Sequence, residues 1–303
     1  MPKCLFIGCS PAQVPYLRAA VALGFDCIVT DRDPLRAGAA HEAGAVEFAT
    51  CGYDDINGML AIAEEVGLGP DDKVFTAAMH HAHEAASAVA YQVGIDYPTP
   101  DAIDRVVCKM RLREVASRWG WMCPDYHTWF PGVWQVGTVA RGFVKSDYGK
   151  SPRYCWPPGT EIAIPHRRDS FFRRAFLEQD SVEGHHWRII ATADGEIGSF
   201  YRPSTAERWI SFSAPCSLGR EVADMATALG RLVLKVDVID ASDEVYLLDV
   251  GIDPPQRLRL YWEAQGEDFA AAYVRHHLTR ERWAFPLPEP GTIIDMEKRQ
   301  CVS

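Results

Sequence analysis

Two lysines occupy positions that suit the binding of phosphate groups. Lys145 ends an apolar strand pattern, and a polar loop that contains Ser146 and Gly149 follows it. A lysine at a strand end can direct its ammonium into a cleft, where loop N–H groups and hydroxyls add further donors for phosphate oxygens. Lys109 lies earlier in the chain, in a predicted helix. The alternative for Lys145 is a surface lysine before an ordinary loop.

Two aspartates stand inside otherwise apolar strand patterns. Asp237 lies in LKVDVID and Asp249 in VYLLDVGID, and a short connection separates the two segments. Buried carboxylates are unfavourable unless a cation or a metal compensates them. Mg²⁺ prefers oxygen ligands and commonly takes one or two carboxylates together with substrate phosphates. The pair therefore predicts a magnesium site, the alternative being that both side chains face solvent.

Two arginines flank a predicted hairpin turn at Asp194-Gly195. Arg188 precedes the turn and Arg202 follows it. Guanidinium groups bind carboxylate and phosphate oxygens through paired hydrogen bonds, so these side chains could clamp a carboxylate or an acyl phosphate. Alternatively, both arginines are exposed to solvent and take part only in surface ion pairs.

An acidic link of extended character precedes this hairpin. Its backbone N–H and C=O groups could line an adenine, because an extended segment leaves these groups available. The histidine that follows could contact a ribose or lie on the surface. The residues concerned are Glu178, Gln179, Asp180, Val182 and His185.

The elements that would position these residues divide the chain into an α/β part and an α+β part. Strands and helices alternate over residues 1–96, which predicts a parallel sheet covered on both faces. Strands dominate later, after a helix that begins at Thr99-Pro100-Asp101 and runs to Gly120. We expect an α/β domain over residues 1–96, an α+β lobe with a hinge over residues 97–182, and a second α+β lobe with a C-terminal tail over residues 183–303.

Composition narrows the function classes. The 303 residues carry a net charge of −10 without a basic tail, which argues against non-specific nucleic-acid binding. No apolar stretch approaches the ~18 residues that a membrane span requires. The nine cysteines form no Cys-x-x-Cys pair, so a zinc site has little support. We therefore expect a cytoplasmic protein with reduced thiols and no nucleic-acid or membrane partner.

Taken in order, these segments resemble the ATP-grasp superfamily. An α/β domain is followed by YPTPDAIDRVVCKMRLREVASRWGWMCPDY, then GFVKSDYG, then FLEQDSVEGHHWRIIATADGEIG, and then VDVIDASDEVYLLDVGIDPP. The order and spacing of these motifs, more than any one of them, carry the resemblance, which spans most of residues 3–260. It implies an ATP-grasp fold: a Rossmann-like parallel-sheet domain followed by two α+β lobes that clamp ATP.

The resemblance also implies roles for the residues named above. The two lysines would hold the α- and β-phosphates of ATP, the two aspartates would hold Mg²⁺, and the loop from Ser146 to Arg153 would close over the nucleotide. The two hairpin arginines, with Arg257, would steady a substrate carboxylate and the transferred phosphoryl group. The implied enzyme is an ADP-forming ligase that joins a small-molecule carboxylate to an amine through an acyl phosphate. An amino acid or small peptide is the expected substrate, and a homodimer is compatible with the resemblance.

The sequence departs from the family pattern at the predicted metal site. Asp249 stands where the family most often has Glu, and Gly251 stands where it usually has Asn. These departures favour, as one alternative, a non-catalytic nucleotide-binding protein on the same fold. Another alternative is an NAD(P) oxidoreductase, supported by the opening CLFIGCSPAQ and by Asp31 at a predicted strand end. Against it, the opening lacks the G-x-G-x-x-G pattern and has Pro11 in its turn.

Overall fold

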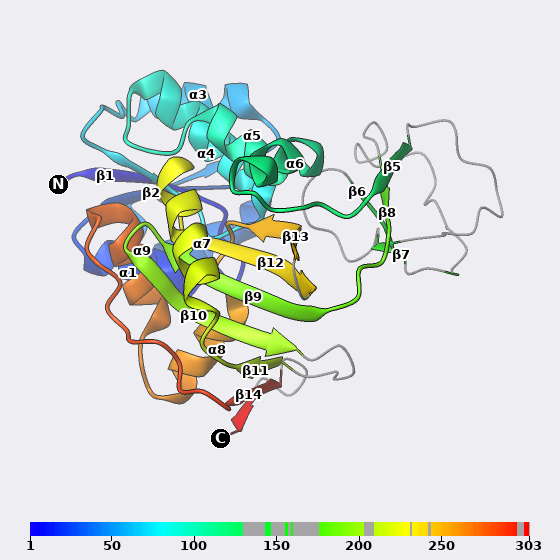
Figure 1. Ribbon diagram of the computed structural model, residues 1–303. Coiled ribbons are helices and arrows are strands. Elements are labelled where there is room, and N and C mark those ends of the chain that lie inside the picture. The colour runs from blue at the N-terminus through cyan, green and yellow to red at the C-terminus, as the bar shows by residue number, and fades with distance from the viewer. Residues whose placement is uncertain are drawn as a thin grey trace.

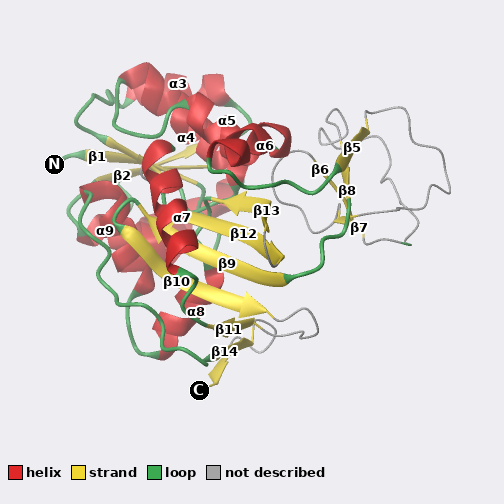
Figure 2. Cartoon of the chain, viewed as in Figure 1, coloured by secondary structure: helices red, strands yellow, loops and turns green. Residues whose placement is uncertain are grey.

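The structure is a computed structural model, and its described part contains three β-sheets with helices packed around them (Figures 1 and 2). In that part of the chain, no helix combines the length and the apolarity that crossing a bilayer requires. The described residues are 1–129, 143–146, 155–156, 159, 176–202, 209–230, 232–241, 244–295 and 300–302.

The first sheet is parallel, as predicted, and forms from the N-terminal residues. Its strand order is β3-β2-β1-β4, and the central strands β1 and β2 are apolar and buried along most of their length. The side chains of Asp33 and Asp55 accept backbone N–H bonds where two of the helices begin. The elements are β1 (Lys3–Ile7), α1 (Val14–Ala22), β2 (Asp26–Asp31), η1 (Pro34–Arg36), α2 (Ala37–Glu42), β3 (Glu47–Thr50), α3 (Ile56–Glu65), β4 (Lys73–Phe75) and α4 (His80–Val93).

Two helices, α5 (Pro100–Val107) and α6 (Lys109–Arg118), stand where a single helix is predicted. The predicted start is confirmed, because the Thr99 hydroxyl accepts the N–H of the third following residue. The prediction of one continuous helix is wrong. Cys108 has an extended backbone, with φ −82° and ψ 112°, so one helix ends and the next begins around it. The break places Lys109 at the first position of α6.

A small antiparallel sheet stands beside the rest of the molecule (Figure 1). The interpretation of the acidic segment as a link is wrong for residues 176–179, because they form β8, which pairs with β5 and β6 inside the sheet. Residues 180–184 make the actual connection to the large sheet. Gly149 and most of the loop that follows Ser146 lie outside the described residues. The strands are β5 (Tyr126–Trp129), β6 (Phe143–Ser146), β7 (Cys155–Trp156) and β8 (Phe176–Gln179), in the order β5-β8-β6-β7.

The large sheet is antiparallel, with the order β13-β12-β9-β10-β11-β14-β15. Alternate residues of β9 separate its two faces: Ile189 packs in the cluster that includes Val222 of α7, whereas Ile190 packs in the cluster that includes Leu258 of α8. The predicted β9–β10 hairpin is present, and the two segments that contain Asp237 and Asp249 pair as a second hairpin, β12–β13. The elements are β9 (His185–Thr192), β10 (Gly195–Arg202), β11 (Trp209–Ser211), α7 (Cys216–Ala228), β12 (Leu234–Ala241), β13 (Glu244–Gly251), α8 (Gln256–Ala264), α9 (Phe269–Thr279), β14 (Ile293–Asp295) and β15 (Gln300–Val302).

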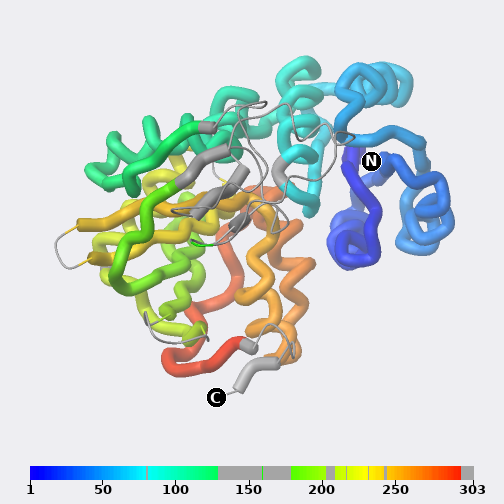
Figure 3. Tube along the Cα trace, turned by 90° about the vertical axis from the view of Figure 1, so that its right-hand side faces the viewer, coloured from blue at the N-terminus to red at the C-terminus, as the bar shows by residue number. Residues whose placement is uncertain are grey.

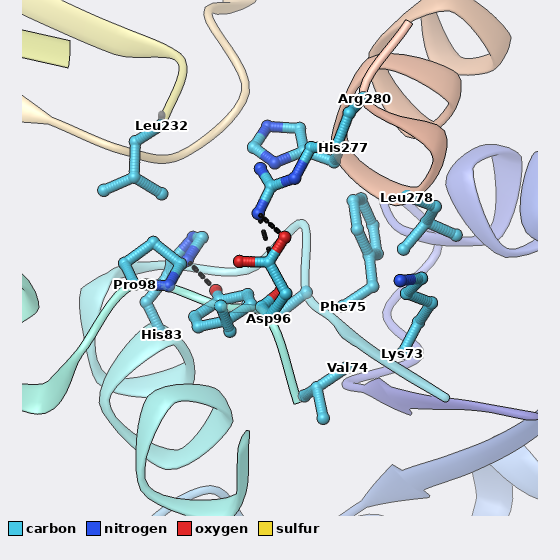
Figure 4. A pocket seen from close by; sticks show the side chains of 12 residues that line it. Lys73, Val74, Phe75, His83, Asp96, Pro98, Leu232, His277, Leu278 and Arg280 are labelled. Atoms are coloured by element: carbon cyan, nitrogen blue, oxygen red, sulfur yellow. Dashed lines mark hydrogen bonds and ion pairs between the residues drawn. The ribbon is translucent and has the colours of Figure 1, made fainter. Parts of the chain in front are cut away.

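Helix α9 joins the large sheet to the N-terminal domain, which lies at the side of the large sheet in Figure 3. Tyr273 of α9 is fully buried and meets Tyr16 and Phe75 edge-on, with ring centroids 5.6 and 6.2 Å apart. At the edge of this contact Arg280 points to Asp96, with 3.2 Å between Nη2 and Oδ2 (Figure 4). The N-terminal domain and the C-terminal helices therefore share one hydrophobic core.

Candidate functional site

One face of the large sheet gathers most of the charged residues predicted for the site. The register places Asp237 of β12 opposite Asp249 of β13 on one side and opposite Arg188 of β9 on the other. Directly opposed residues project to the same face of a sheet, so these three side chains form a row across three strands. Arg202 of β10 pairs with His186, which lies two residues from Arg188 and shares its face.

Asp237 and Arg188 form a two-pronged ion pair, and their side chains are only 15% and 16% exposed. Arg188 Nε donates to Oδ1 at 2.6 Å and Nη2 donates to Oδ2 at 2.5 Å. Burial alone would raise the pKa of the Asp237 carboxyl, but the charge and hydrogen bonds of Arg188 outweigh it and hold that pKa below its ordinary value. Asp237 is therefore a carboxylate at neutral pH.

Lys109 ends the same row at the edge strand β13. Its Nζ lies 3.2 Å from Asp249 Oδ1, and its side chain is 6% exposed. An ammonium at the first position of a helix interacts unfavourably with the helix dipole. The ion pair with Asp249 compensates for this position. Both predicted aspartates are thus bonded to a cation of the protein, and the four residues Lys109, Asp249, Asp237 and Arg188 are called the charged row below.

Three arginines surround the indole ring of Trp209. The guanidinium carbons of Arg188, Arg202 and Arg257 lie 5.2, 5.1 and 4.7 Å from the ring centroid, within the range of cation–π attraction. Arg257 extends from the first turn of α8, so the structure brings all three predicted arginines together. The sequence analysis missed Trp209, because nothing in its local pattern distinguishes it from the other tryptophans of the chain.

Positive charge exceeds negative charge around Trp209 in the described part of the chain. Asp237 neutralises Arg188, whereas Arg202 Nη2 bonds to His186 Nδ1 at 2.8 Å. Burial is the main cause that lowers the pKa of His186 to about 4; the neighbouring arginines lower this pKa further, and the charge of Asp237 opposes them. His186 is therefore neutral and accepts this bond. Burial and then the neighbouring arginines lower the pKa of Arg257 to about 10, and its Nε is buried without a partner among the described residues. An anionic ligand would complement this cluster.

A second lysine, which the sequence analysis did not single out, lies across Gly251. Lys235 opposes Gly251 in the β12–β13 register, and its Nζ lies 2.7 Å from Asp253 Oδ2. A Cβ at position 251 would lie 2.5 Å from Lys235 Cε. The lysine therefore occupies the space that any larger residue at position 251 would need.

The small sheet carries four of the other predicted nucleotide-binding residues: Lys145, Ser146, Glu178 and Gln179. Lys145 and Ser146 lie in β6, beside the strand that contains Glu178. Gln179 is 3% exposed, and its Oε1 accepts a hydrogen bond from Arg113 Nη2 at 3.4 Å. The Gln179 side chain is thus occupied within the structure.

In the connection between the small sheet and the large sheet, one of the backbone N–H groups predicted to line an adenine is already hydrogen-bonded within the protein. The N–H of Asp180 donates to the carbonyl of Asp125 at 2.9 Å, so it is not available to an adenine in this conformation. Val182 is half-buried in the connection. His185 is exposed at the start of β9, and its Nδ1 lies 2.6 Å from the Tyr201 hydroxyl.

The turn after β1 does not provide the open glycine site of a dinucleotide-binding domain. Gly8 has φ +91°, and a Cβ there would lie 2.6 Å from Nε2 of Gln13, whose side chain covers it. The Asp31 carboxylate accepts the N–H groups of Cys9 at 2.7 Å and Asp33 at 3.0 Å. Because a pyrophosphate approaches such a glycine closely and a ribose requires the acid, this geometry disfavours the NAD(P) alternative.

Solved structures share the architecture along nearly the whole chain. N5-carboxyaminoimidazole ribonucleotide synthetase from Thermotoga maritima has a TM-score of 0.65 at 13% identity, over 97% of this chain and 79% of that one. L-amino acid ligase from Bacillus licheniformis has a TM-score of 0.64 at 12% identity, over 97% and 78% of the two chains. The biotin carboxylase domain of 2-oxoglutarate carboxylase from Hydrogenobacter thermophilus, in complex with MgADP, ADP and bicarbonate, has a TM-score of 0.65 at 14% identity, over 96% and 73%. No protein-family model and no curated protein sequence matches the chain.

The chain has the ATP-grasp fold. This confirms the fold predicted from the order of the motifs. An ATP-grasp fold implies Mg²⁺, and the donor chemistry of the site fits it: Asp237 and Asp249 offer carboxylate oxygens from paired positions. The described residues contain no group of three or more His, Cys, Asp or Glu side chains that could hold a metal. A cation between the two aspartates would therefore depend on phosphate and water oxygens for its other ligands.

Proposed function

We propose that the protein is an ATP-dependent, ADP-forming ligase that joins a carboxylate to an amine. The observation that carries the proposal is the charged row on one sheet face, with the arginine cluster of Trp209 at its end. The row offers cations and carboxylates suited to a metal-bound polyphosphate, and the cluster offers an anion site next to it. The similar folds named above include a synthetase, a ligase and a carboxylase domain with bound MgADP, which supports this reaction class.

Lys109 and Lys145 would hold the α- and β-phosphates of ATP. Lys109 is bonded to Asp249, and we infer that a phosphate oxygen of ATP would take the place of this carboxylate as its partner. Mg²⁺ held by Asp237 and Asp249 would neutralise charge on the β- and γ-phosphates. The small sheet and the connection after it would enclose the rest of the nucleotide through Ser146, Gly149, Glu178, Gln179, Asp180, Val182 and His185.

The arginine cluster would orient the acid substrate for two successive displacements. In the first, a carboxylate oxygen attacks the γ-phosphorus, the bond from that phosphorus to the β–γ bridging oxygen breaks, and ADP leaves. In the second, the amine nitrogen attacks the acyl carbon, the bond from this carbon to the phosphate oxygen breaks, and the nitrogen loses a proton. Arg188, Arg202 and Arg257 would stabilise the negative charge of the carboxylate and of the transferred phosphoryl group.

The proposal extends to the class of substrate and to the oligomeric state of the protein. We propose an amino acid or a small peptide as the acid or the amine. We also propose a homodimer, since the biotin carboxylase domain that resembles this chain is named as a dimer. Light scattering on the purified protein tests the assembly, and a mass of one chain would contradict it.

The reaction is tested with purified protein, Mg-ATP and panels of amino acids and peptides. ADP and phosphate should appear in equal amounts, and only when an acid and an amine are both present. Release of AMP would contradict an acyl-phosphate route. Lys109→Met should abolish nucleotide binding in calorimetry, because it removes the ammonium of the charged row, and Lys145→Ala should do the same. Arg118→Met, at the exposed far end of α6, is the matched control and should bind nucleotide normally.

One observation favours a second candidate function, a nucleotide-binding protein without ligase activity. Asp237, Asp249 and Asp253 are each bonded to a cation of the protein, which competes with a metal for their oxygens. ATP binding without turnover across the same panels of acids and amines would favour this candidate over the ligase.

A further inference from the structure

The next paired positions along the face of the charged row are Lys235 and Gly251. Residues two apart in a strand project to the same face, so Lys235, two residues before Asp237, and Gly251, two residues after Asp249, lie on the face of the charged row. Asp253 comes two residues after Gly251 and bonds to the Lys235 ammonium at 2.7 Å. Beside the Asp237–Asp249 pair there is thus a third carboxylate, which is bound to a cation of the protein itself.

The end of the Lys235 side chain fills the space between Gly251 and Asp253. The point where a Gly251 Cβ would stand is 2.5 Å from Lys235 Cε, 3.1 Å from its Nζ and 3.2 Å from Asp253 Oδ1. The lysine side chain is 7% exposed and the aspartate side chain 16%. Mg²⁺ requires near-octahedral oxygen ligands at about 2.0–2.1 Å. It cannot share this space with a carbon chain and an ammonium group, whose charge also repels it.

We propose that Lys235 closes this position, so that the site takes one divalent cation per nucleotide and not two. The inference rests on the proposed function, since it concerns the metal site of the ligase. Asp237 and Asp249 provide the single cation position, whereas the Lys235–Asp253 pair is internally neutral and contributes no ligand. Lys235 is a positioning residue: it fixes Asp253 and thereby sets the number of metal ions.

The experiment counts Mn²⁺ ions bound to the full-length protein, by electron paramagnetic resonance, with saturating ADP and without it. The unmodified protein with ADP should hold one Mn²⁺. Lys235→Ala removes both the ammonium and the carbon chain that fill the space and leaves Asp253 without its lysine partner, so it should bind one more Mn²⁺ than the unmodified protein. Lys235→Arg keeps a cation and should add none. Lys235→Ala/Asp253→Asn removes the lysine and the carboxylate charge together and should also add none.

Two Mn²⁺ ions in the unmodified protein with ADP, or no additional Mn²⁺ in Lys235→Ala, would overturn the inference. If Lys235→Ala folds poorly without metal, the shift of its melting temperature with Mn²⁺ replaces the count. That shift should exceed the shift of the unmodified protein, and equal shifts would overturn the inference. Failure of the unmodified protein to bind ADP would contradict the proposed function instead, and the comparison of variants without ADP still decides the role of Lys235.

Discussion

Asp237 and Arg188 depend on each other, because each is a largely desolvated charge with the other as its counter-ion. Asp237→Asn keeps the shape of the side chain but leaves the guanidinium without a carboxylate. Removal of one partner of such a pair is strongly destabilising, and we expect the free energy of unfolding to fall by about 3 kcal/mol. Urea denaturation measures it. Asp224→Asn, at an exposed position of α7, is the control and should change stability by less than about 0.5 kcal/mol. A loss of similar size in both variants would contradict the argument.

His186 gives the stability of the protein a defined pH dependence. Its pKa is about 4 in the folded protein, against about 6.5 for an ordinary histidine. Between these values the unfolded chain binds the proton and the folded protein does not, so stability falls as the pH falls from about 6.5 towards about 4, by up to about 3 kcal/mol. Above this window the residue contributes no pH dependence.

Denaturation at pH 7.5 and pH 5 tests this role of His186. His186→Gln keeps an acceptor for Arg202 and should reduce the difference in stability between the two pH values. His185→Gln is the neighbouring control at an exposed position and should leave the difference unchanged. An unaltered difference in His186→Gln would show that other groups cause it.

At the scale of elements, Gly184 allows the connection after β8 to pass close to β12. Its φ is +155°, and a Cβ would lie 2.6 Å from the Asp240 carbonyl oxygen. Gly184→Ala should destabilise the protein by about 1–3 kcal/mol more than Gly120→Ala, because steric overlap adds to backbone strain. Gly120 also has positive φ, +70°, but a Cβ there meets nothing within 4 Å. Thermal unfolding of both variants gives the comparison, and equal losses would contradict it.

The elements also show what local sequence can predict. The β9–β10 hairpin was predictable from Asp194-Gly195 and from the alternation of apolar residues on both sides. The preference of these two residues for a tight turn and the two-residue period of a strand are both properties of the local sequence. The break at Cys108 has no glycine or proline beside it, so the local sequence does not signal it. In the site, aspartates inside apolar strands were predictable because a buried charge is unusual. The association of Lys235 with Asp253 could not be predicted from the sequence, because it depends on how the pairing of β12 with β13 brings the two side chains together.

At the scale of the whole molecule, the shared core should make the N-terminal domain and the large sheet unfold together. Tyr273→Ala removes a fully buried ring that contacts Tyr16 and Phe75 of the N-terminal domain and whose hydroxyl donates to the Ile252 carbonyl after β13. We expect a loss of about 3–5 kcal/mol within a single transition. Calorimetry measures it. Tyr91→Ala is the control, because that ring is 70% exposed, and it should be close to neutral. A separate early transition for the N-terminal domain would contradict the expectation.

The small sheet reaches the rest of the molecule through two connections, and both are fastened at their inner ends. Met122 exchanges backbone hydrogen bonds with β13, and Gly184 packs against Asp240 of β12. Between these points the bond from Asp180 to Asp125 ties the two connections to each other. Arg113 of α6 adds a further tie, because it bonds to Gln179 and lies over the Tyr126 ring. A shift of the described part of the small sheet relative to the charges on the large sheet would therefore have to break or bend these ties.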